Sequence, residues 1–352
     1  MVRQDEYMIN KVKVMVVNDS SYMRELLVDL LHSSSKVEVS DTARDGIEAI
    51  KKIKQNKPDV VLLDLEMPNM DGFTFIEQVM KEQPIPIVVV SSYGQDDVEI
   101  VFEALESGAV DFVSIPHEGP EKLRNLESNL ISKILIASEA NLELLQTRNT
   151  KNIDKEMKIE GAASNVIVIG ASTGGPGVLR HILSELPNNL HSGILIVQHM
   201  PIGFTTGFAK HLDGVSKIRV KEAVNGDVIK EGIALVAPAD YHMLVKSSRS
   251  IELNKSPKIL GVRPSVNVSM ITAAEAYGSN TVGILLSGMG RDGAFGMKVI
   301  KKRGGITIAQ DESSSIVFGM PKAAYDLGVV DKILPLNKIT EEIVLAVDRH
   351  AR

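Results

Sequence analysis

The chain has no cysteine or tryptophan and few aromatic residues of any kind. Aromatic residues make up 4% of the 352 positions, and the formal net charge is −6. The absence of cysteine excludes disulfides, cysteine nucleophiles and zinc sites with cysteine ligands. The shortage of aromatic rings argues against a surface on which nucleic-acid bases stack. Because there is also no basic stripe, we do not expect nucleic acid to be a partner.

Long apolar runs are also missing. No run reaches the roughly 18 residues that a membrane-spanning helix needs. Residues 1–6 mix both charge signs and do not lead into the apolar core of a signal peptide. We therefore expect a cytoplasmic protein that is not inserted in a membrane. Its length suits two domains better than one.

Residues 10–125 alternate short apolar runs with amphipathic stretches. Five strands, each followed by a helix, are typical of a doubly wound parallel sheet. The most apolar run, at 60–64, favours a central strand that is buried on both faces. The expected strands are 12–17, 37–43, 60–64, 85–91 and 109–115, and the expected helices are 22–31, 47–53, 71–82 and 96–107.

A helical stretch at 121–147 and a polar segment at 149–160 separate this series from a second one. We expect 126–162 to be a helical extension and linker. Residues 163–352 form the second α/β domain. Its expected strands are 166–169, 193–197, 281–287 and 306–309, its expected helices are 176–186, 204–212, 270–277, 294–303 and 339–347, and strand and hairpin signals crowd 217–262.

Polar residues follow three of the expected strands in the first domain. Asn18 and Asp19 come after the first strand, Asp64 after the third, and Ser91 and Ser92 after the fourth. Ligands of open parallel sheets bind beyond these carboxyl ends. Carboxylates there suit Mg²⁺ and would make Asp64 a nucleophile towards a phosphoryl donor. An isolated Asp at a strand end, however, is more often a helix cap or a turn residue.

Residues 60–72 resemble the phosphoacceptor segment of response-regulator receiver domains. Residues 14–20, 91–92 and 108–116 fall where the other segments of that family fall. The resemblance implies a flavodoxin-like, five-stranded parallel sheet. It also implies the following site residues: Asp64 as phosphoacceptor, Asp19 and Asp64 as Mg²⁺ ligands, and Ser91 and Phe112 as the residues that respond to phosphorylation.

Two positions depart from the receiver pattern. Asn18 replaces one of two adjacent acids, and Ile115 stands where receivers carry a lysine before the final proline. Losing a carboxylate should weaken Mg²⁺ binding. Losing the lysine removes the cation that would contact the phosphoryl group on Asp64. Two alternatives therefore remain: a receiver that is phosphorylated slowly, and a receiver-shaped domain with a structural or docking role.

The second domain begins with a glycine-rich turn around Ser172. Residues 170–174 follow an expected strand, precede a helix and fit G-x-S-x-G, the sharp turn that exposes a nucleophilic serine. The helix beyond would offer backbone N–H groups to an anion. A nucleotide-binding loop is the rival interpretation, but the turn has neither the P-loop lysine nor the G-x-G-x-x-G register.

A nucleophilic serine needs a base and an acid that orients it. His199 directly follows an expected strand and should lie near Ser172, although a lone histidine there is more often structural. Asp292 follows another strand and is by default the N-cap of the next helix. His242 could line a site. The order Ser172, His199, Asp292 differs from that of α/β-hydrolases, so we expect a different fold.

Residues 165–345 resemble the catalytic domain of the CheB family, the chemotaxis receptor methylesterases. The matching segments are 169–176, 198–201, 237–243, 263–266, 286–294, 310–313 and 319–321. The resemblance implies a Rossmann-like, doubly wound domain with Ser172 as nucleophile, His199 as base and Asp292 as its orienting group. It implies the N–H of Met289 as an oxyanion donor, with Thr173 beside the nucleophile. Asn267 stands where many relatives carry Asp.

The same resemblance implies a reaction and its control. The chain would hydrolyse γ-methyl esters of glutamates on the cytoplasmic helices of chemoreceptors, and also glutamine amides, with no cofactor. A chemotaxis histidine kinase would phosphorylate the receiver, which would cover the esterase cleft until then. The alternatives are a serine esterase or amidase of another substrate, a binding module without catalysis, and a DNA-binding regulator, which would need a basic output domain.

Overall fold

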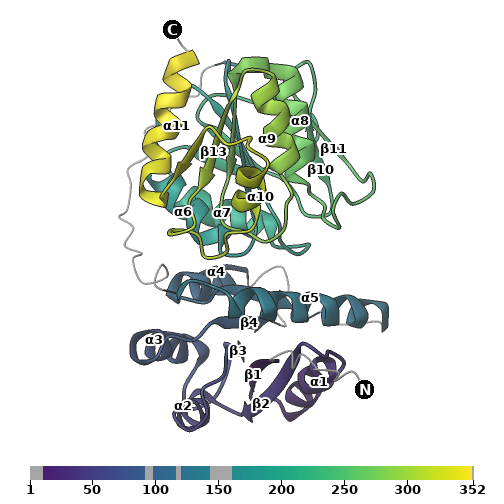
Figure 1. The fold of residues 1–352 in the computed structure, drawn as a ribbon, viewed down its shortest axis with the longest axis vertical. Helices are drawn as coiled ribbons and strands as arrows, with labels where there is room; N and C mark the ends of the chain where they lie inside the picture. Colours follow the sequence, from purple (N-terminus) through teal and green to yellow (C-terminus); the bar gives the residue numbers. More distant parts are fainter. Residues whose placement is uncertain (1–10, 92–97, 116–119, 143–160, 351–352) are drawn as a thin grey trace, which may run out of the picture. The chain divides into compact units, whose positions relative to one another are not determined.

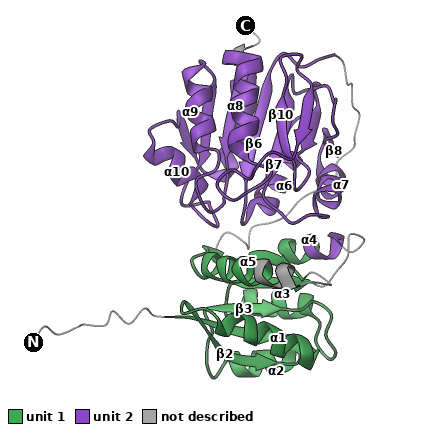
Figure 2. Ribbon diagram, turned by 90° about the vertical axis from the view of Figure 1, so that its right-hand side faces the viewer, with its two compact units in different colours: residues 1–93, 103–142 green, residues 94–102, 143–352 purple. Residues whose placement is uncertain are grey.

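The computed structural model describes residues 11–91, 98–115, 120–142 and 161–350. The chain divides into two compact units, one over residues 1–93 and 103–142 and the other over residues 94–102 and 143–352 (Figure 2). Within the described residues, no helix is long and apolar enough to cross a membrane.

The first unit is built on a parallel sheet of five strands in the order β2-β1-β3-β4-β5 (Figure 1). All four residues of β3 are buried, as expected of a central strand between two layers of helices. This confirms the predicted doubly wound sheet. The strands are β1 (Val12–Val17), β2 (Val37–Ala43), β3 (Val60–Leu63), β4 (Ile87–Ser91) and β5 (Asp111–Ser114).

Three helices of this unit begin at side chains that cap them. Ser20, Asp45 and Asp71 each accept a hydrogen bond from the N–H three residues later. Asp71 thus caps α3, just beyond the β3 end that carries Asp64. The helices wholly within this unit are α1 (Ser21–His32), α2 (Gly46–Ile53), α3 (Gly72–Glu82) and α5 (Pro120–Ser138), and α4 (Val98–Ser107) belongs to it only from residue 103 on.

The helix that follows β5 is shorter than the sequence indicated. α5 ends at Ser138 instead of continuing to 147, and the polar segment at 149–160 lies outside the described residues. Leu130 and Ile134 are buried, and α5 contacts β1, β3, β4 and β5. The helix therefore packs on the first sheet. The domain limits 10–125, 126–162 and 163–352 stay predictions.

The second unit is built on a parallel sheet of seven strands in the order β14-β13-β12-β6-β7-β9-β8. From β6 the chain first builds outward through β7, β8 and β9 and then returns to add β12, β13 and β14 on the other side. The reversal lies between β6 and β12, where open α/β sheets place their binding crevice. The strands are β6 (Val166–Ala171), β7 (Gly193–Gln198), β8 (Arg219–Glu222), β9 (Ile233–Val236), β12 (Thr281–Leu285), β13 (Ile306–Gln310) and β14 (Lys332–Leu334).

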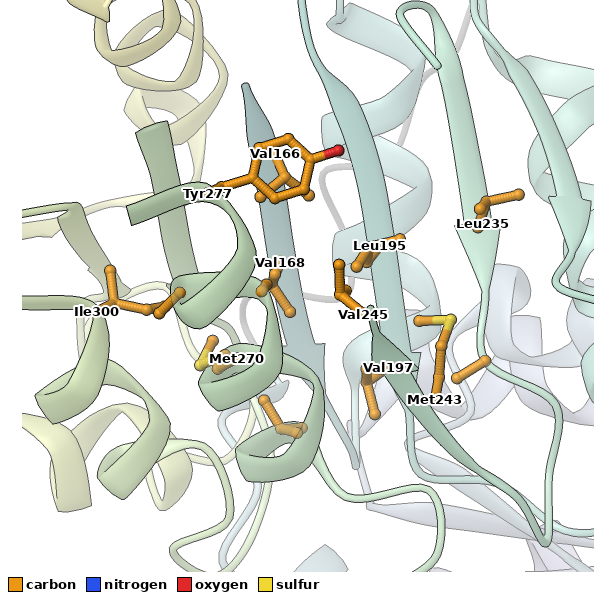
Figure 3. Close-up of a cluster of buried hydrophobic side chains, with 14 of the residues drawn as sticks. Val166, Val168, Leu195, Val197, Leu235, Met243, Val245, Met270, Tyr277 and Ile300 are labelled. Atoms are coloured by element: carbon orange, nitrogen blue, oxygen red, sulfur yellow. The ribbon is translucent and has the colours of Figure 1, made fainter. Parts of the chain in front are cut away.

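Helices cover both faces of this sheet. One face carries α8, α9 and α10, and the other carries α6, α7 and α11. Under α8, Val166 and Val168 of β6 pack with Met270 and with an antiparallel hairpin, β10–β11 (Figure 3). The elements are α6 (Gly175–Glu185), α7 (Thr205–Val215), β10 (His242–Val245), β11 (Ile251–Asn254), α8 (Val266–Tyr277), α9 (Ala294–Lys302), α10 (Met320–Asp326) and α11 (Leu336–His350).

The predicted elements of this unit are present, with shifts of up to three residues at the ends of several of them and three larger differences. α8 begins at Val266, four residues before the expected start at 270. The short helix α10 and the three-residue edge strand β14 were not predicted. The side chains of β14 are exposed or half-buried, so its sequence carries no apolar pattern that would indicate a strand.

Candidate functional site

Ser172 and His199 stand at neighbouring strand ends in the second unit. β6 and β7 pair in register through Ala171 and Gln198, the residues that directly precede them. The N–H of His199 donates to the carbonyl of Ala171 at 3.0 Å, which extends the ladder by one residue. Neighbouring strands lie about 4.8 Å apart. The backbone therefore brings Ser172 and His199 within side-chain reach, although the hydrogen bonds of the described residues include none between Ser172 Oγ and His199.

The turn that carries Ser172 is held by the loop after β12. The N–H of Ser172 donates to the carbonyl of Ser287 at 3.1 Å, and the Ser287 hydroxyl donates to the carbonyl of Thr173 at 2.8 Å. Gly174, with φ of +74°, then starts α6 in the left-handed conformation that favours glycine. These contacts fix the backbone on both sides of Ser172, whose side chain stays partly exposed, while Thr173 is buried.

The buried side chain of Gln198 links the residues that follow β6 and β7. Its side chain is buried, and Nε2 donates to the carbonyl of Ser172 at 2.8 Å and to the carbonyl of His199 at 3.0 Å. One amide group thus holds the backbone of both residues. Gln198 was not among the predicted site residues.

His199 is hydrogen-bonded to a buried carboxylate. Its Nε2 lies 3.0 Å from Oδ2 of Asp292. Because a carboxylate accepts, Nε2 carries the proton, and Nδ1 is the ring nitrogen left to accept one. Burial acts to raise the pKa of Asp292, but the hydrogen bond and charge of His199, with further hydrogen bonds from Ser265 and Asn267, outweigh it and hold that pKa below its usual value.

The N-terminus of α8 surrounds the same carboxylate. The Ser265 hydroxyl donates to Oδ1 of Asp292 at 2.8 Å and the N–H of Val266 to Oδ2 at 2.6 Å. The positive end of the helix dipole therefore stabilises the ionised form. An isolated Asp at this turn would by default cap the helix that follows it, but Gly293 is the N-cap of α9, and Asp292 accepts hydrogen bonds from the start of α8 instead. The remaining donors to Oδ1 are the N–H groups of Asn267 and Gly293, each at 3.1 Å.

Gly170 allows α8 to come this close to the sheet. A Cβ on Gly170 would lie 2.4 Å from Cγ1 of Val266, the first residue of α8. Real Cβ atoms do not approach that closely, so a larger residue in β6 would push the start of the helix away. The glycine two residues before Ser172 thus helps to bring the acceptor for His199 to the strand end.

Asn267 also has a structural role at this junction. Its side-chain oxygen accepts a hydrogen bond from the N–H of Gly296 at 2.7 Å, in the first turn of α9. The N-cap of α9 is a glycine without a side chain, so Asn267 supplies the missing acceptor. An amide does this without placing a second negative charge beside Asp292, which is a physical reason for Asn where relatives were expected to carry Asp.

The loop between β12 and Asp292 contains the predicted oxyanion donor, Met289. The carbonyl of Gly288 accepts from the N–H groups of Gly319 and Met320, at 3.1 and 2.7 Å, and this holds the loop in place. Within the described part of the chain, no hydrogen bond engages the N–H of Met289. That donor is available to an oxygen atom from outside the protein.

In the first unit, Asp64 follows β3 and is largely buried. Burial and the nearby charge of Asp19 raise its pKa to about 6, despite a hydrogen bond from the N–H of Glu66. Asn18, also buried, donates from Nδ2 to Oδ2 of Asp64 at 2.8 Å. The residue that replaces an expected acid thus binds the phosphoacceptor candidate as a neutral donor.

Two carboxylates at this edge are available to a cation. Asp19 is exposed and Asp64 lies beside it, but the described residues contain no group of three or more acidic or histidine side chains that could hold a metal. The oxygen of Asn18 already accepts from the N–H of Ser20 at 2.9 Å. The donor set therefore fits a hard ion such as Mg²⁺ with two protein carboxylates, because a cation would offset the burial and the Asp19 charge that raise the pKa of Asp64.

Ser91 and Phe112, the predicted response residues, lie on neighbouring strands β4 and β5. Both are buried, and Phe112 pairs with Val89, two residues before Ser91. Ile115 follows β5 and donates its N–H to the carbonyl of Ser91 at 2.8 Å. Its aliphatic side chain supplies no positive charge where the family has a lysine. Ser92 lies outside the described residues.

Replacing Asp64 with asparagine should stabilise the first unit at alkaline pH. A carboxyl whose folded pKa of about 6 lies above its usual 3.8 disfavours the fold when ionised. This penalty is complete above about pH 6 and vanishes as the pH falls to about 4. We expect Asp64→Asn to raise the free energy of opening β3 by about 1–2 kcal/mol at pH 8, after allowance for partial exposure, and by little at pH 4.

Hydrogen exchange of the β3 amides in the full chain measures this difference without Mg²⁺. The exposed Asp29, replaced by asparagine, is the charge-matched control. A gain that does not depend on pH, or the same gain in Asp29→Asn, would contradict the burial of an ionised Asp64 as its cause.

Both halves of the chain match known protein families. The CheB methylesterase model matches residues 167–343, and the response regulator receiver domain model matches residues 14–126. A protein-glutamate methylesterase/protein-glutamine glutaminase of Pyrococcus abyssi is 49% identical over 346 residues, covering 96% of this chain and 94% of the relative. A protein of the same name from Archaeoglobus fulgidus is 42% identical, covering 95% and 97%.

Among solved structures, the CheB methylesterase catalytic domain of Thermotoga maritima is similar to the second unit. It is 43% identical, with a TM-score of 0.51, and the match covers 51% of this chain and 97% of that domain. The relatives and the two family matches span nearly the whole sequence. The chain therefore belongs to the CheB methylesterase family, with a response regulator receiver domain ahead of the catalytic domain.

Proposed function

We propose that the chain hydrolyses the γ-methyl esters of glutamates on chemoreceptors, with Ser172, His199 and Asp292 as the catalytic residues. The observation that carries the proposal is the hydrogen bond between His199 and the buried Asp292, at the strand end beside Ser172. The relatives named as methylesterases supply the substrate. Because those glutamates lie on cytoplasmic receptor helices, we place the reaction in the cytoplasm.

The first half of the reaction makes an ester between Ser172 and the substrate. Oγ attacks the ester carbonyl carbon while Nδ1 of His199 takes the hydroxyl proton, and the imidazolium returns that proton to the methoxide as methanol leaves. Asp292 stabilises the imidazolium through Nε2 and stays ionised, which its depressed pKa favours. No cofactor is needed for these steps.

The second half returns the enzyme to its starting state. A water molecule, deprotonated by Nδ1 of His199, attacks the carbonyl carbon of the glutamyl ester. The bond to Oγ of Ser172 breaks, the imidazolium returns its proton to Oγ, and the receptor side chain leaves as a glutamate. The N–H of Met289 stabilises the oxyanion of both tetrahedral intermediates. Thr173 flanks the nucleophile on the same turn. The same steps would convert a glutamine side chain to glutamate with release of ammonia, the second activity in the names of the relatives.

Methanol release from receptor membranes tests the proposal. Membranes with methylated receptors should release methanol when the full chain is added, and membranes with unmethylated receptors should not. A small methyl ester discriminates poorly, because many serine esterases would cleave it. Folded protein that releases no methanol from methylated receptors would overturn the substrate assignment.

Replacing Gly288 with alanine should slow the reaction. A Cβ there would lie 2.7 Å from Cβ of Ser172 and 2.9 Å from its backbone nitrogen, so the Ser172 turn must shift. A misplacement of about 1 Å can cost on the order of 10²-fold in rate. We expect kcat for methanol release to fall by that order, with a change in unfolding free energy of about 1–3 kcal/mol.

Gly214→Ala is the matched control for this substitution. A Cβ at Gly214, near the end of α7, meets no atom within 4 Å. The control should keep the wild-type kcat. A Gly288→Ala variant with unchanged kcat would show that the loop after β12 does not fix the position of Ser172.

We further propose that phosphorylation of Asp64 activates the esterase. The donor would be a chemotaxis histidine kinase, and Mg²⁺, held by Asp19 and Asp64, would neutralise charge at phosphorus. Ser91 and Phe112 would respond to the phosphoryl group. Asn18 holds Asp64 in place by a hydrogen bond. Burial raises the pKa of Asp64 only to about 6, so the carboxylate is mostly ionised at pH 7, which supports slow phosphorylation rather than none.

Methanol release should therefore rise when Mg²⁺ and a small phosphodonor are added. Asn18→Asp supplies a third carboxylate and should lower the Mg²⁺ concentration needed by roughly tenfold or more. Asp64→Asn should abolish the response and keep the basal rate. Release that is indifferent to the donor in the wild type and in Asn18→Asp would favour a docking domain over a switch.

A further inference from the structure

We propose that His242 is a positioning residue for ester hydrolysis, which acts on Asp292 through Ser265. This rests on the function proposed above. His242 begins β10, and its side chain is 1% exposed. It lies outside the Ser172, His199 and Asp292 set, and packing alone does not account for its contacts.

Both ring nitrogens of His242 are engaged, and their directions are fixed by the partners. The N–H of Ser265 lies 3.2 Å from Nδ1, and the carbonyl oxygen of Pro257 lies 3.1 Å from Nε2. A backbone N–H can only donate and a carbonyl can only accept. Nδ1 is therefore the acceptor and Nε2 the donor, so the ring is neutral and holds a single tautomer.

Ser265 connects this ring to the catalytic carboxylate. Its N–H binds His242, while its hydroxyl donates to Oδ1 of Asp292 at 2.8 Å. Ser265 is the N-cap residue of α8, yet its side chain makes no capping bond to its own helix. The hydroxyl is committed to Asp292 instead of to the role that serine usually has at this position.

The position of Ser265 also determines where the first N–H groups of α8 lie. Val266 and Asn267 follow it directly, and both donate to Asp292. A ring that fixes Ser265 thus fixes three of the donors around the carboxylate that orients His199. An aliphatic residue at 242 could fill the same space, but it would leave the N–H of Ser265, which is fully buried, without an acceptor.

Three substitutions separate the roles of the ring. Asparagine at 242 can place its oxygen near the position of Nδ1, so His242→Asn keeps the acceptor for Ser265. Glutamine extends to the position of Nε2, so His242→Gln keeps the donor to Pro257. His242→Leu keeps only the volume. If His242 positions Asp292 through Ser265, kcat should fall on the order of 10²-fold in His242→Leu and His242→Gln, with KM little changed, and His242→Asn should restore most of it.

A second readout does not depend on the substrate. The proton on Nε2 of His199, bonded to Asp292, should give a downfield ¹H NMR signal, assigned by its loss in His199→Gln. We expect this signal to shift or broaden in His242→Leu and in Ser265→Ala, and to persist in His242→Asn. Failure of the function proposed above would remove methanol release from the wild type while leaving this pattern intact, so the two failures are distinguishable.

The outcomes decide the inference even if His242→Leu does not fold. Ser265→Ala and His242→Asn then remain, together with the double variant of His242→Gln and Ser265→Ala. Action through Ser265 predicts that the double variant loses less kcat than the product of the two single losses, because the two substitutions disturb a shared donor to Asp292. If His242→Gln and His242→Asn have the same kcat and both leave the His199 signal unchanged, His242 is only a packing residue and the inference is overturned. Losses that multiply in the double variant would overturn it as well.

Discussion

Replacing Ser172 with alanine should lower the rate of methanol release by a factor on the order of 10⁴ to 10⁶, to the limit of detection. In serine hydrolases the loss of the nucleophile alone removes nearly all of the catalysis that the three residues provide together. Here the alanine removes the hydroxyl that directly follows β6, on the strand end paired with the one that leads to His199. The methylated receptor should still bind, because the turn is fixed by backbone contacts that the substitution keeps.

Methanol release and receptor binding, measured side by side, test this expectation. Ser248→Ala, in an exposed turn, is the matched control and should keep the wild-type rate. A Ser172→Ala variant that still releases methanol at more than about a hundredth of the wild-type rate would show that another group attacks the ester. A variant that keeps the full chemotactic effect without releasing methanol would favour a binding module.

Much of the candidate site could be predicted because its members stand next to strands. Ser172 and His199 directly follow apolar runs, and in a parallel sheet such residues meet at one edge. Asp64 and Asn18 follow the same rule in the first unit, where the structure joins them by a hydrogen bond. Short motifs therefore located these residues before any three-dimensional information.

The residues that hold the site could not be predicted in the same way. Gln198, Ser287 and Ser265 lie within the motifs, but their contacts join segments far apart in the sequence. The early start of α8 has the same cause. Ser265 is followed three residues later by Val268 instead of the Glu or Gln of a capping box, and its hydroxyl bonds a carboxylate 27 residues away instead of its own helix.

Asp292 does not take the default role of an aspartate at such a turn, which is to cap the next helix, for a related reason. The residue before a helix usually caps that helix, and the sequence offers no sign that α8 lies closer than α9. Gly293, with φ of +92°, turns the chain so that α9 begins without a hydrogen bond from the Asp292 side chain. The freed carboxylate then meets the N-terminus of α8, where Gly170 leaves room.

Replacing Asp292 with asparagine should lower kcat on the order of 10⁴-fold, a loss second only to that of Ser172→Ala. Every group within hydrogen-bond distance of the carboxylate is a donor, whether from Ser265, from the backbone at the start of α8 or from His199. If the amide nitrogen takes the place of Oδ2, it faces Nε2 of His199 and forces that nitrogen to accept. The proton then moves to Nδ1, which can no longer take the proton of Ser172.

The opposite orientation of the amide is also unfavourable, for a reason that stability measurements detect. With nitrogen in the place of Oδ1, the amide points its hydrogens at the N–H groups of Asn267 and Gly293. Leaving buried donors unpaired costs about 1–3 kcal/mol. Asp292→Asn should therefore lower the unfolding free energy of the second unit as well as kcat. Asp326→Asn, at an exposed aspartate that ends α10, is the control for both measurements and should leave kcat unchanged.

The pH dependence of this stability loss identifies its cause. A carboxyl whose folded pKa lies below its usual value of 3.8 stabilises the fold above that value, and the contribution is lost as the pH falls through the folded pKa. The difference in unfolding free energy between the wild type and Asp292→Asn should therefore be full at pH 6 to 8 and shrink below about pH 4. A difference that stayed constant down to pH 3 would mean that packing, and not the ionised carboxylate under α8, sets the cost. The depressed kcat would then have to be explained without the charge that holds His199 in the tautomer the reaction requires.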